Sequence, residues 1–294
     1  MRRFDVYVPD DLIDLLEYLD GHQIGVHLIA NGSDLINRIR RREVTPKVVV
    51  DLSGLSEFNY VRKEGDTIKI GALTTVADLA SSPVIDTHHS VFREVAAKFG
   101  GPSIRNVATV GGNICAASSS EDLLPVLLVL DANVRLKSKR GERLLRLEEF
   151  LRGKRLIDLK PSEILTETMF QELDADSACA FEKIGMRNSL IIAFVSSAVY
   201  LKLNSKTGVV DDVRIAFNRV AGRIPGRARH SEEALRGKIL TPRLVEETSH
   251  VLNKELRPSS DFRVSGEYRS QVASVLFKRA LKRCYETLVG RELV

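Results

Sequence analysis

The sequence predicts an α+β protein with two α+β units in tandem, followed by a domain of sheet and helices. Three patterns predict this organisation. Helical periodicity alternates with short β-branched runs in the first half, a hairpin pattern follows, and antiparallel strand patterns precede a helical C-terminal part. A chain of 294 residues is long enough to bury more than one core.

The first unit is expected to be strand and helix in alternation. Apolar residues recur at helical spacing over residues 12–19, directly after two aspartates. A short apolar run at residues 27–30 ends at the polar turn 31–34, and helical spacing resumes at Leu35. The run at residues 47–52 is typical of a buried strand.

The second unit is expected to begin near Glu57. Its predicted strands and helices are separated by a long glycine- and serine-rich stretch over residues 103–120, for which no element is predicted. The elements expected around that stretch are a strand at 67–73, helices at 75–79, 91–99 and 122–130, a hairpin of 134–137 with 143–147, and a strand at 164–168.

A change of composition over residues 171–178 predicts a domain boundary. Beyond it, antiparallel strands are expected at 190–203 and 209–217, and helices at 231–236, 241–256 and 267–289. From residue 218 onward the chain has 16 Lys and Arg against 9 Asp and Glu. With few aromatic residues and no nucleic-acid motif, this surplus indicates a solvated or partner-facing surface, and no nucleic-acid binding is expected.

Composition excludes several classes of protein. With 44% hydrophobic and 28% charged residues, a disordered chain is not expected. No apolar run approaches the length of a membrane span, so no membrane insertion is expected, and the N-terminus lacks a secretory apolar region. The three cysteines are far apart, which argues against a disulfide framework or a metal site and indicates a cytoplasmic protein.

The familiar catalytic and nucleotide motifs are absent. None of the 19 glycines forms G-x-G, so the Rossmann fingerprint is missing, and there is no P-loop. Ser118-Ser119-Ser120 lacks the setting of a nucleophile elbow, and His88-His89 is interpreted as a solvated pair. No catalytic residue and no metal ligand are therefore predicted within this chain.

Two loops remain as candidates for binding an anion. Residues 31–34 follow a strand and precede a helix, and residues 109–113 read Thr-Val-Gly-Gly-Asn in an apolar stretch. Successive backbone N–H groups without bulky side chains can form a concave anion nest. Each loop alone is more often a plain turn, but two facing loops could hold both phosphates of a dinucleotide without a Rossmann fold.

Three motifs come in the order and spacing of one family. Ala30-Asn31-Gly32-Ser33-Asp34 is followed by Ile70-Gly71-Ala72-Leu73-Thr74-Thr75 and then by Ile104-Arg105-Asn106-Val107-Ala108-Thr109-Val110-Gly111-Gly112-Asn113-Ile114. They resemble the FAD-binding (medium) subunit of molybdenum hydroxylases: the xanthine, carbon monoxide and nicotinate dehydrogenases. The resemblance continues through Phe181-Glu182-Lys183 and residues 257–263, and so covers nearly the whole chain.

The resemblance implies a fold in three parts. An FAD-binding fold of two α+β subdomains, of the vanillyl-alcohol oxidase type, would occupy residues 1–56 and 57–173. A C-terminal domain of the CO dehydrogenase flavoprotein type, with a three-stranded antiparallel sheet and helices, would occupy residues 178–294.

It also implies the residues that bind the cofactor. The first loop would cradle the pyrophosphate and ribose, and the second would face it. Asp122 would bind polar groups of the cofactor, Phe99 and Leu165 would pack near the flavin, and Lys183 would place a cation close to its ring. The expected set is Leu28, Ile29, Ala30, Asn31, Gly32, Ser33, Asp34, Leu35, Phe99, Thr109, Val110, Gly111, Gly112, Asn113, Asp122, Leu165 and Lys183.

The chain departs from the family pattern at two places. Asn31 replaces the first glycine of the usual A-G-G-T-D loop, and Asn is the residue besides Gly that best tolerates left-handed backbone. Asn188-Ser189-Leu190 replaces acidic residues, which puts contacts of that segment with flavin or pyridine nucleotide in question. No histidine lies inside either loop, so FAD is expected to bind non-covalently.

The expected function is that of an electron-transfer subunit. Electrons from a molybdopterin-containing large subunit would pass through a 2Fe–2S small subunit to FAD here, and then to NAD⁺, quinone, ferredoxin or oxygen. The molybdenum cofactor and the clusters would reside only in those partners. Two alternatives remain open: a stand-alone FAD-dependent oxidase or dehydrogenase of the same fold, and a scaffold subunit without flavin.

Overall fold

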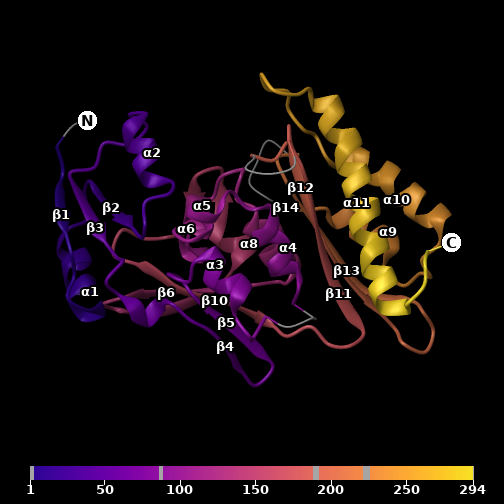
Figure 1. Ribbon diagram of the computed structural model, residues 1–294, viewed down its shortest axis with the longest axis horizontal. Coiled ribbons are helices and arrows are strands. Elements are labelled where there is room, and N and C mark those ends of the chain that lie inside the picture. The colour runs from indigo at the N-terminus through magenta and orange to yellow at the C-terminus, as the bar shows by residue number, and fades with distance from the viewer. Residues whose placement is uncertain (1–2, 86–88, 188–191, 221–225, 294) are drawn as a thin grey trace. The chain divides into compact units, whose positions relative to one another are not determined.

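The computed structural model describes residues 3–85, 89–187, 192–220 and 226–293 (Figure 1). Contacts divide the chain into two compact units. Unit 1 comprises Met1–Val84, Gly101–Ala117 and Ala132–Phe170, and unit 2 comprises Ile85–Gly100, Ser118–Asp131 and Gln171–Val294. The chain therefore enters unit 2 twice before residue 171.

The elements of unit 1 form three sheets with flanking helices. Its strands are β1 (Asp5–Tyr7), β2 (Val26–Ile29), β3 (Val48–Asp51), β4 (Val61–Glu64), β5 (Thr67–Gly71), β6 (Asn133–Ser138), β7 (Gly141–Arg146), β8 (Leu151–Gly153), β9 (Leu156–Ile157) and β10 (Ile164–Gln171). Its helices are α1 (Leu12–Gly21), α2 (Leu35–Arg40), the 3₁₀ turn Ser56–Phe58, α3 (Val76–Ser81), α5 (Pro102–Arg105), α6 (Val110–Ala116) and α8 (Leu147–Phe150).

The N-terminal part of unit 1 is a parallel sheet of order β1-β3-β2. Asp11 begins α1 by accepting a hydrogen bond from the Asp14 N–H, 2.8 Å away. The apolar stripe of α1 is buried together with β3, and Leu15 and Val50 are fully buried in this cluster. The strand, turn and helix predicted for this part are found.

The larger sheet of unit 1 has the order β4-β5-β10-β6-β7. The predicted hairpin is β6 with β7. The stretch of residues 103–120, for which no element is predicted, contains α5 and α6. Pro102 lies in the first turn of α5 and Thr109 caps α6, but both helices are so short, and α6 so rich in glycine, that no periodicity reveals them.

Unit 2 is built on one antiparallel sheet of order β11-β12-β13-β14. Its strands are β11 (Ser177–Ile184), β12 (Val195–Leu203), β13 (Val210–Asn218) and β14 (Gly226–Arg227). The expected sheet of three strands therefore gains a fourth, which is only two residues long and leaves no sequence pattern. β11 also lies where no strand is predicted from the sequence, because Glu182 and Lys183 interrupt its apolar alternation.

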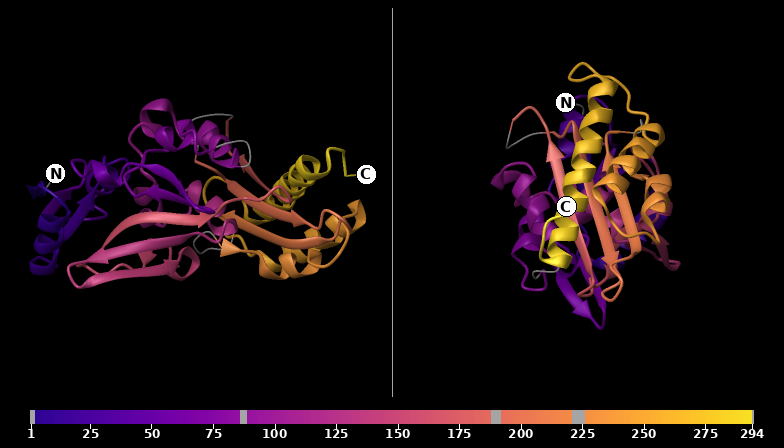
Figure 2. Two further views of the ribbon diagram at one scale, coloured as in Figure 1. Left: turned by 90° about the horizontal axis from the view of Figure 1, so that it is seen from below. Right: turned by 90° about the vertical axis from the view of Figure 1, so that its right-hand side faces the viewer.

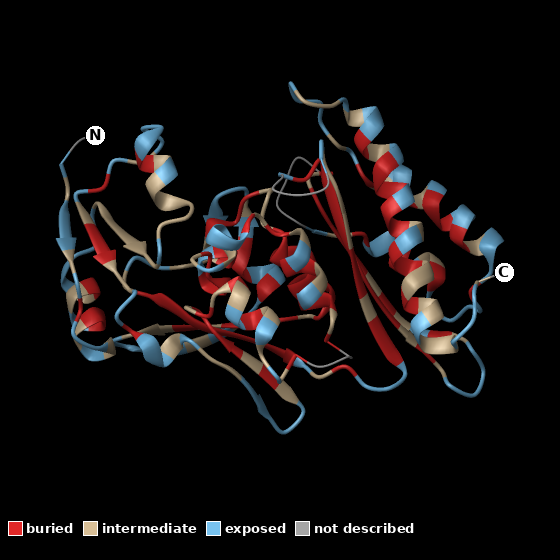
Figure 3. Ribbon diagram, in the orientation of Figure 1, coloured by how far each residue is buried: buried red, intermediate tan, exposed pale blue. Residues whose placement is uncertain are grey.

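Helices cover both faces of this sheet. On one face α11 (Gly266–Val289) lies along β11 and β12, beside α10 (Pro242–Glu255), and α9 (Arg229–Leu235) lies against β13 (Figure 2). The buried side of α11 is turned to the sheet and its outer side is exposed (Figure 3). On the other face α7 (Leu123–Val129) packs on β12 and β13, and α4 (Val91–Lys98) packs on β11.

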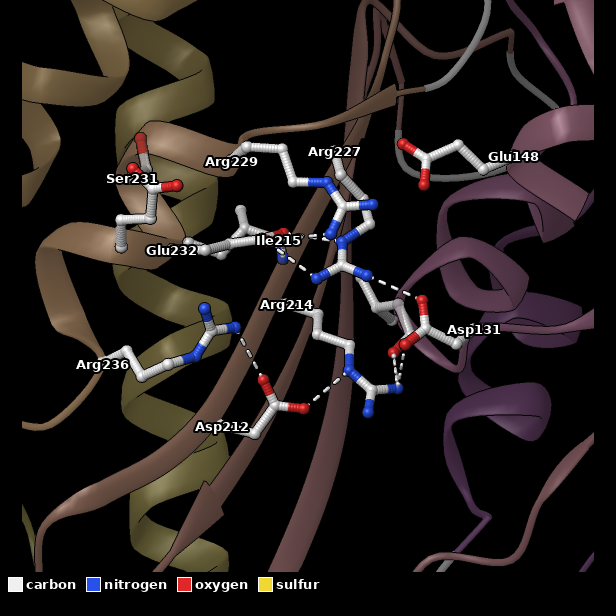
Figure 4. A network of polar contacts seen from close by, with 12 residues as sticks. Asp131, Glu148, Asp212, Arg214, Ile215, Arg227, Arg229, Ser231, Glu232 and Arg236 are labelled. Atoms are coloured by element: carbon white, nitrogen blue, oxygen red, sulfur yellow. Dashed lines mark hydrogen bonds and ion pairs between the residues drawn. The ribbon is translucent and has the colours of Figure 1, made fainter. Parts of the chain in front are cut away.

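A network of buried charges joins β14, α9 and the end of α7 within unit 2 (Figure 4). The Arg227 guanidinium forms two hydrogen bonds of 2.8 and 2.7 Å with the Glu232 carboxylate, and a third of 2.7 Å with Asp131. Arg227 and Glu232 expose only 3% and 2% of their side chains. Glu232 also accepts the N–H of Ile215 on β13 at 2.9 Å, so this charge pair is part of the core.

Some expectations need correction or lie outside the description. His89 is buried, and its Nε2 lies 3.3 Å from the N–H of Leu173, so it is not solvated. His88, residues 188–190 and the predicted start of a strand at 190 lie outside the described residues. None of the described helices is both long and apolar enough to cross a bilayer.

Candidate functional site: a dinucleotide pocket in unit 1

A pocket of about 420 Å³ lies within unit 1, where β2 and α6 meet the start of β10. Its volume is within the roughly 300–1,000 Å³ that is usual for cofactor sites. Most of its wall is apolar, with Leu28 and Ala30 on one side and Leu165 on another. Thr109, Gly111 and Gly112 of the second loop line it as well.

The first loop supplies unpaired donors beside this pocket. Gly32 has a positive φ of 78°, and a Cβ there would lie 2.8 Å from Ile36 Cγ1, so only glycine fits without strain. Within the described residues, the backbone N–H groups of Gly32 and Ser33 have no hydrogen-bond partner. These are the groups that an anion nest requires.

The second loop is the first turn of α6, and the N–H groups of residues 110–113 already donate to acceptors of the protein. Thr109 caps the helix, with its Oγ1 accepting from the Gly112 N–H at 3.1 Å. The Gly111 N–H donates to the Ala72 carbonyl at 2.8 Å, and a Cβ on Gly111 would lie 2.7 Å from that oxygen. This loop therefore fixes the pocket wall by close approach to Ala72, instead of offering the free donors that the sequence suggested.

Asn31 connects the two loops directly. Its side-chain Nδ2 donates a hydrogen bond of 3.1 Å to the carbonyl oxygen of Val107, two residues before the second loop. This contact gives a physical reason for an asparagine in place of glycine: a glycine could adopt the loop conformation but could not make this hydrogen bond.

Asp34 is held by a residue that sequence reasoning missed. Arg155, in the turn between β8 and β9, forms hydrogen bonds of 2.6 and 3.0 Å with the two carboxylate oxygens of Asp34. Because 121 positions separate the two residues, no local sequence pattern could have revealed the pair.

His27, next to the predicted loop, was also missed. It lines the pocket, and its Nδ1 is buried without a hydrogen-bond partner among the described residues. A buried orphan nitrogen is a candidate contact for a polar ligand. The only signal in the sequence is its position directly before Leu28.

Two titratable side chains of the pocket, Cys115 and Glu163, are unsuited to proton transfer or nucleophilic attack. Burial raises the pKa of the Cys115 thiol to about 12, so it is protonated at neutral pH. Burial would also raise the pKa of Glu163, but hydrogen bonds of 2.8 Å from Arg143 and from the Lys160 N–H outweigh it and keep the carboxylate charged. Neither group has the character of a general base or a nucleophile.

The other expected residues of unit 1 surround the pocket without lining it. They are Ile29, Asn31, Gly32, Ser33, Asp34, Leu35, Val110 and Asn113. Leu28, Ala30, Thr109, Gly111, Gly112 and Leu165 form part of its wall. The structure thus brings both loops and Leu165 together within one unit.

Phe99, Asp122 and Lys183 belong to unit 2. The Lys183 Nζ lies 2.5 Å from Asp122 Oδ2 and donates to the Lys98 carbonyl at 2.9 Å. Only 2% of the lysine and 7% of the aspartate side chain are exposed. Burial raises the pKa of Asp122, opposed in part by Lys183 and Arg219. Phe99 is buried at the C-terminal end of α4.

The residues that line the unit 1 pocket and those of the first loop beside it fit an FAD. The unpaired N–H groups of Gly32 and Ser33 suit a diphosphate, and the apolar wall suits ring and ribose surfaces. A side chain larger than glycine at position 32 or 111 would disturb the surrounding packing.

Comparison with known proteins identifies the family to which both parts of the chain are similar. The model of the "FAD binding domain in molybdopterin dehydrogenase" matches residues 2–170, and that of the "CO dehydrogenase flavoprotein C-terminal domain" matches residues 180–284. The nicotinate dehydrogenase FAD-subunit of Eubacterium barkeri is 32% identical over 294 residues, which are 99% of each chain. The carbon monoxide dehydrogenase medium chain of Hydrogenophaga pseudoflava is 26% identical and covers 96% of this chain and 97% of its own.

A solved structure of carbon monoxide dehydrogenase from Hydrogenophaga pseudoflava superimposes with a TM-score of 0.92 at 26% identity, covering 97% of this chain and 98% of that one. The predicted α+β fold class and the FAD-binding character are confirmed by these matches. The relatives are flavoprotein components of dehydrogenases. The chain belongs to the family of FAD-binding subunits of molybdopterin dehydrogenases.

Proposed function

We propose that this chain is the FAD-holding electron-transfer subunit of a molybdenum hydroxylase complex. It would take electrons from a 2Fe–2S small subunit, served by a molybdopterin-containing large subunit, and pass them to NAD⁺ or another acceptor. The observation that carries the proposal is the pocket of unit 1, whose wall includes Leu28 and Ala30 directly before the first loop, the second loop, and Leu165. Membership of a family of FAD-binding subunits supports it.

Bound FAD would supply the exchange between two-electron and one-electron transfer that such a subunit needs. The protein would bind it non-covalently and orient it. In this proposal the N–H groups of Gly32 and Ser33 bind the diphosphate, and the second loop and Leu165 close the pocket wall. Glu163 and Cys115 are not available as base or nucleophile, which is consistent with a subunit that binds the cofactor without substrate chemistry of its own.

For Phe99, Asp122 and Lys183, which lie in unit 2, a role toward the flavin stays a prediction from the family resemblance. Since Lys183 is paired with Asp122, its positive charge is largely balanced within unit 2. The pair would then serve as a hydrogen-bonding group for the flavin more than as an isolated cation, which modifies the role expected from the sequence.

The first test is binding of FAD to the flavin-stripped chain, measured by quenching of flavin fluorescence. Ala30→Phe places a ring in the pocket and is expected to weaken binding at least about tenfold, since it fills space that the cofactor needs. Ile13→Trp, on the exposed side of α1, adds comparable bulk elsewhere in unit 1 and is the control. Equal binding by wild type and Ala30→Phe would contradict this site.

A second measurement concerns the acceptor. The FAD-loaded chain is mixed anaerobically with NADH, and the absorbance of oxidised flavin is followed. If NAD⁺ is the acceptor, the reverse hydride transfer bleaches the flavin. If NADH leaves the flavin oxidised, NAD⁺ is contradicted as the acceptor. If a quinone then reoxidises the chemically reduced flavin, a quinone is supported as the acceptor.

A further inference from the structure

Arg155 links three segments around the proposed diphosphate site. Its guanidinium binds both oxygens of Asp34 at 2.6 and 3.0 Å, and its NH1 also donates to the Ala116 carbonyl at 3.3 Å. Its backbone N–H donates to the Ala117 carbonyl at 2.8 Å. One residue in the β8–β9 turn thereby ties the first loop to the C-terminal end of the helix that carries the second loop.

The backbone of Arg155 is held in an uncommon conformation. Its φ is 61°, in the left-handed region that residues with a side chain seldom adopt. Such a residue persists where its surroundings over-determine it, and it occurs often at ligand sites. Here the hydrogen bonds to Ala116, Ala117 and Asp34 provide that restraint.

Asp34 does not cap the helix α2 that begins directly after it. It is the N-cap residue of α2, but its side chain makes no capping hydrogen bond. Asp34 follows directly after Gly32 and Ser33 in the chain. The proposed function assigns the N–H groups of those two residues to the diphosphate. An uncompensated carboxylate at that place would repel the two negative charges of the dinucleotide.

We propose that Arg155 is a positioning residue for the FAD diphosphate. It neutralises Asp34 by a two-point ion pair and holds the first loop against the end of α6, so that the loop presents its N–H groups to an anion. Arg38 lies 4.0 Å from the same carboxylate and contributes less, because it makes a single, longer contact. This inference rests on the proposed function.

The test compares FAD binding by wild type, Arg155→Met, Asp34→Asn and the double variant, using fluorescence quenching at low ionic strength. Arg155→Met is expected to raise the Kd about tenfold or more, because Asp34 is left uncompensated near a dianion. Asp34→Asn is expected to change the Kd by less than about threefold. The double variant should recover at least half of the loss on a logarithmic scale, since the repelling charge is gone.

The matched control is Arg152→Met. Arg152 lies on the neighbouring β8, is half exposed and pairs with Asp158 at 2.7 Å, so the same charge is removed without touching Asp34. Its Kd should equal that of wild type. Repeating the Arg155→Met titration near 1 M salt should shrink the loss, because exposed charges are screened over about 3 Å at that ionic strength.

The outcomes separate this inference from the proposed function. If the wild type does not bind FAD, the proposed function fails, and the inference fails with it. If the wild type binds and Arg155→Met binds equally well, the inference alone is overturned. If Arg155→Met and the double variant lose affinity equally at every salt concentration, the charge role is overturned. Far-UV circular dichroism of each variant confirms that it folds, and Arg155→Lys, which keeps the charge without the two-point geometry, should lie between wild type and Arg155→Met.

Discussion

Two ion pairs, one in each unit, differ in how far they are exposed. Beside the pocket of unit 1, the Arg155–Asp34 pair is partly exposed, with 30% of the arginine and 39% of the aspartate side chain accessible. In unit 2 the Arg227–Glu232 pair is enclosed, with 3% and 2% of the two side chains exposed. Exposed pairs contribute little to stability, whereas removal of one partner from a buried pair is costly. The Arg155–Asp34 pair is therefore suited to ligand binding, and the Arg227–Glu232 pair to holding the sheet and helices of unit 2 together.

The largest effect on stability is expected when Arg227 of the buried pair is replaced. Arg227→Met leaves Glu232 buried without its two-point partner, and we expect a loss of about 3–5 kcal/mol in the free energy of unfolding. Urea unfolding followed by circular dichroism measures it. The control is Arg243→Met, whose pair with Glu247 is 89% and 56% exposed and should cost less than about 1 kcal/mol. Similar losses for the two variants would contradict the contrast drawn between buried and exposed pairs.

A smaller effect is expected at the second buried pair. Lys183→Met leaves the Asp122 carboxylate buried, but Asp122 can relieve the penalty by taking up a proton, so a loss of about 2–3 kcal/mol is expected at neutral pH. When the pKa of a carboxyl is raised in the folded state, the folded protein becomes less stable as the pH rises above the ordinary pKa of that group, which is near 3.8 for Asp122. The penalty of Lys183→Met should therefore grow from pH 5 to pH 8.

Urea titrations of wild type and Lys183→Met at several pH values provide the measurement. The matched variant is Asp122→Asn combined with Lys183→Met, which removes both charges and should recover most of the stability without the added pH dependence. A penalty that is constant with pH would show that packing of the lysine side chain, and not the unpaired carboxylate, is lost.

The sequence predicted those parts of the molecule that depend on local chemistry. The first loop follows from an apolar run that ends at Asn31-Gly32, although its left-handed backbone lies at Gly32 and not at Asn31, where the glycine-to-asparagine replacement led us to expect it. The helix 91–99 and the hairpin of β6 and β7 follow from periodicity and turn residues in the same way. The family resemblance added the pairing of the two loops, which local chemistry alone left open.

What could not be predicted depends on contacts between distant residues. The pairing of Arg155 with Asp34 joins positions 121 residues apart, and the partner of Lys183 is 61 residues away. β11 was missed because its polar residues Glu182 and Lys183 have partners from other elements, so that the strand lacks a simple alternation. The assignment of residues 85–100 and 118–131 to unit 2 likewise arises from packing.

The smallest predicted effect concerns the backbone contact that closes the pocket wall. A Cβ at Gly111 would lie 2.7 Å from both the Cβ and the carbonyl oxygen of Ala72, so Gly111→Ala must displace α6 from that backbone. We expect a loss of about 1–2 kcal/mol, as for other overpacked sites, together with weaker FAD binding. Gly54→Ala is the control, because a Cβ there meets nothing within 4 Å. The backbone of Ala72 cannot move aside as easily as a flexible side chain can. If Gly111→Ala is as stable as Gly54→Ala and binds FAD unchanged, α6 does not form the wall of the cofactor pocket.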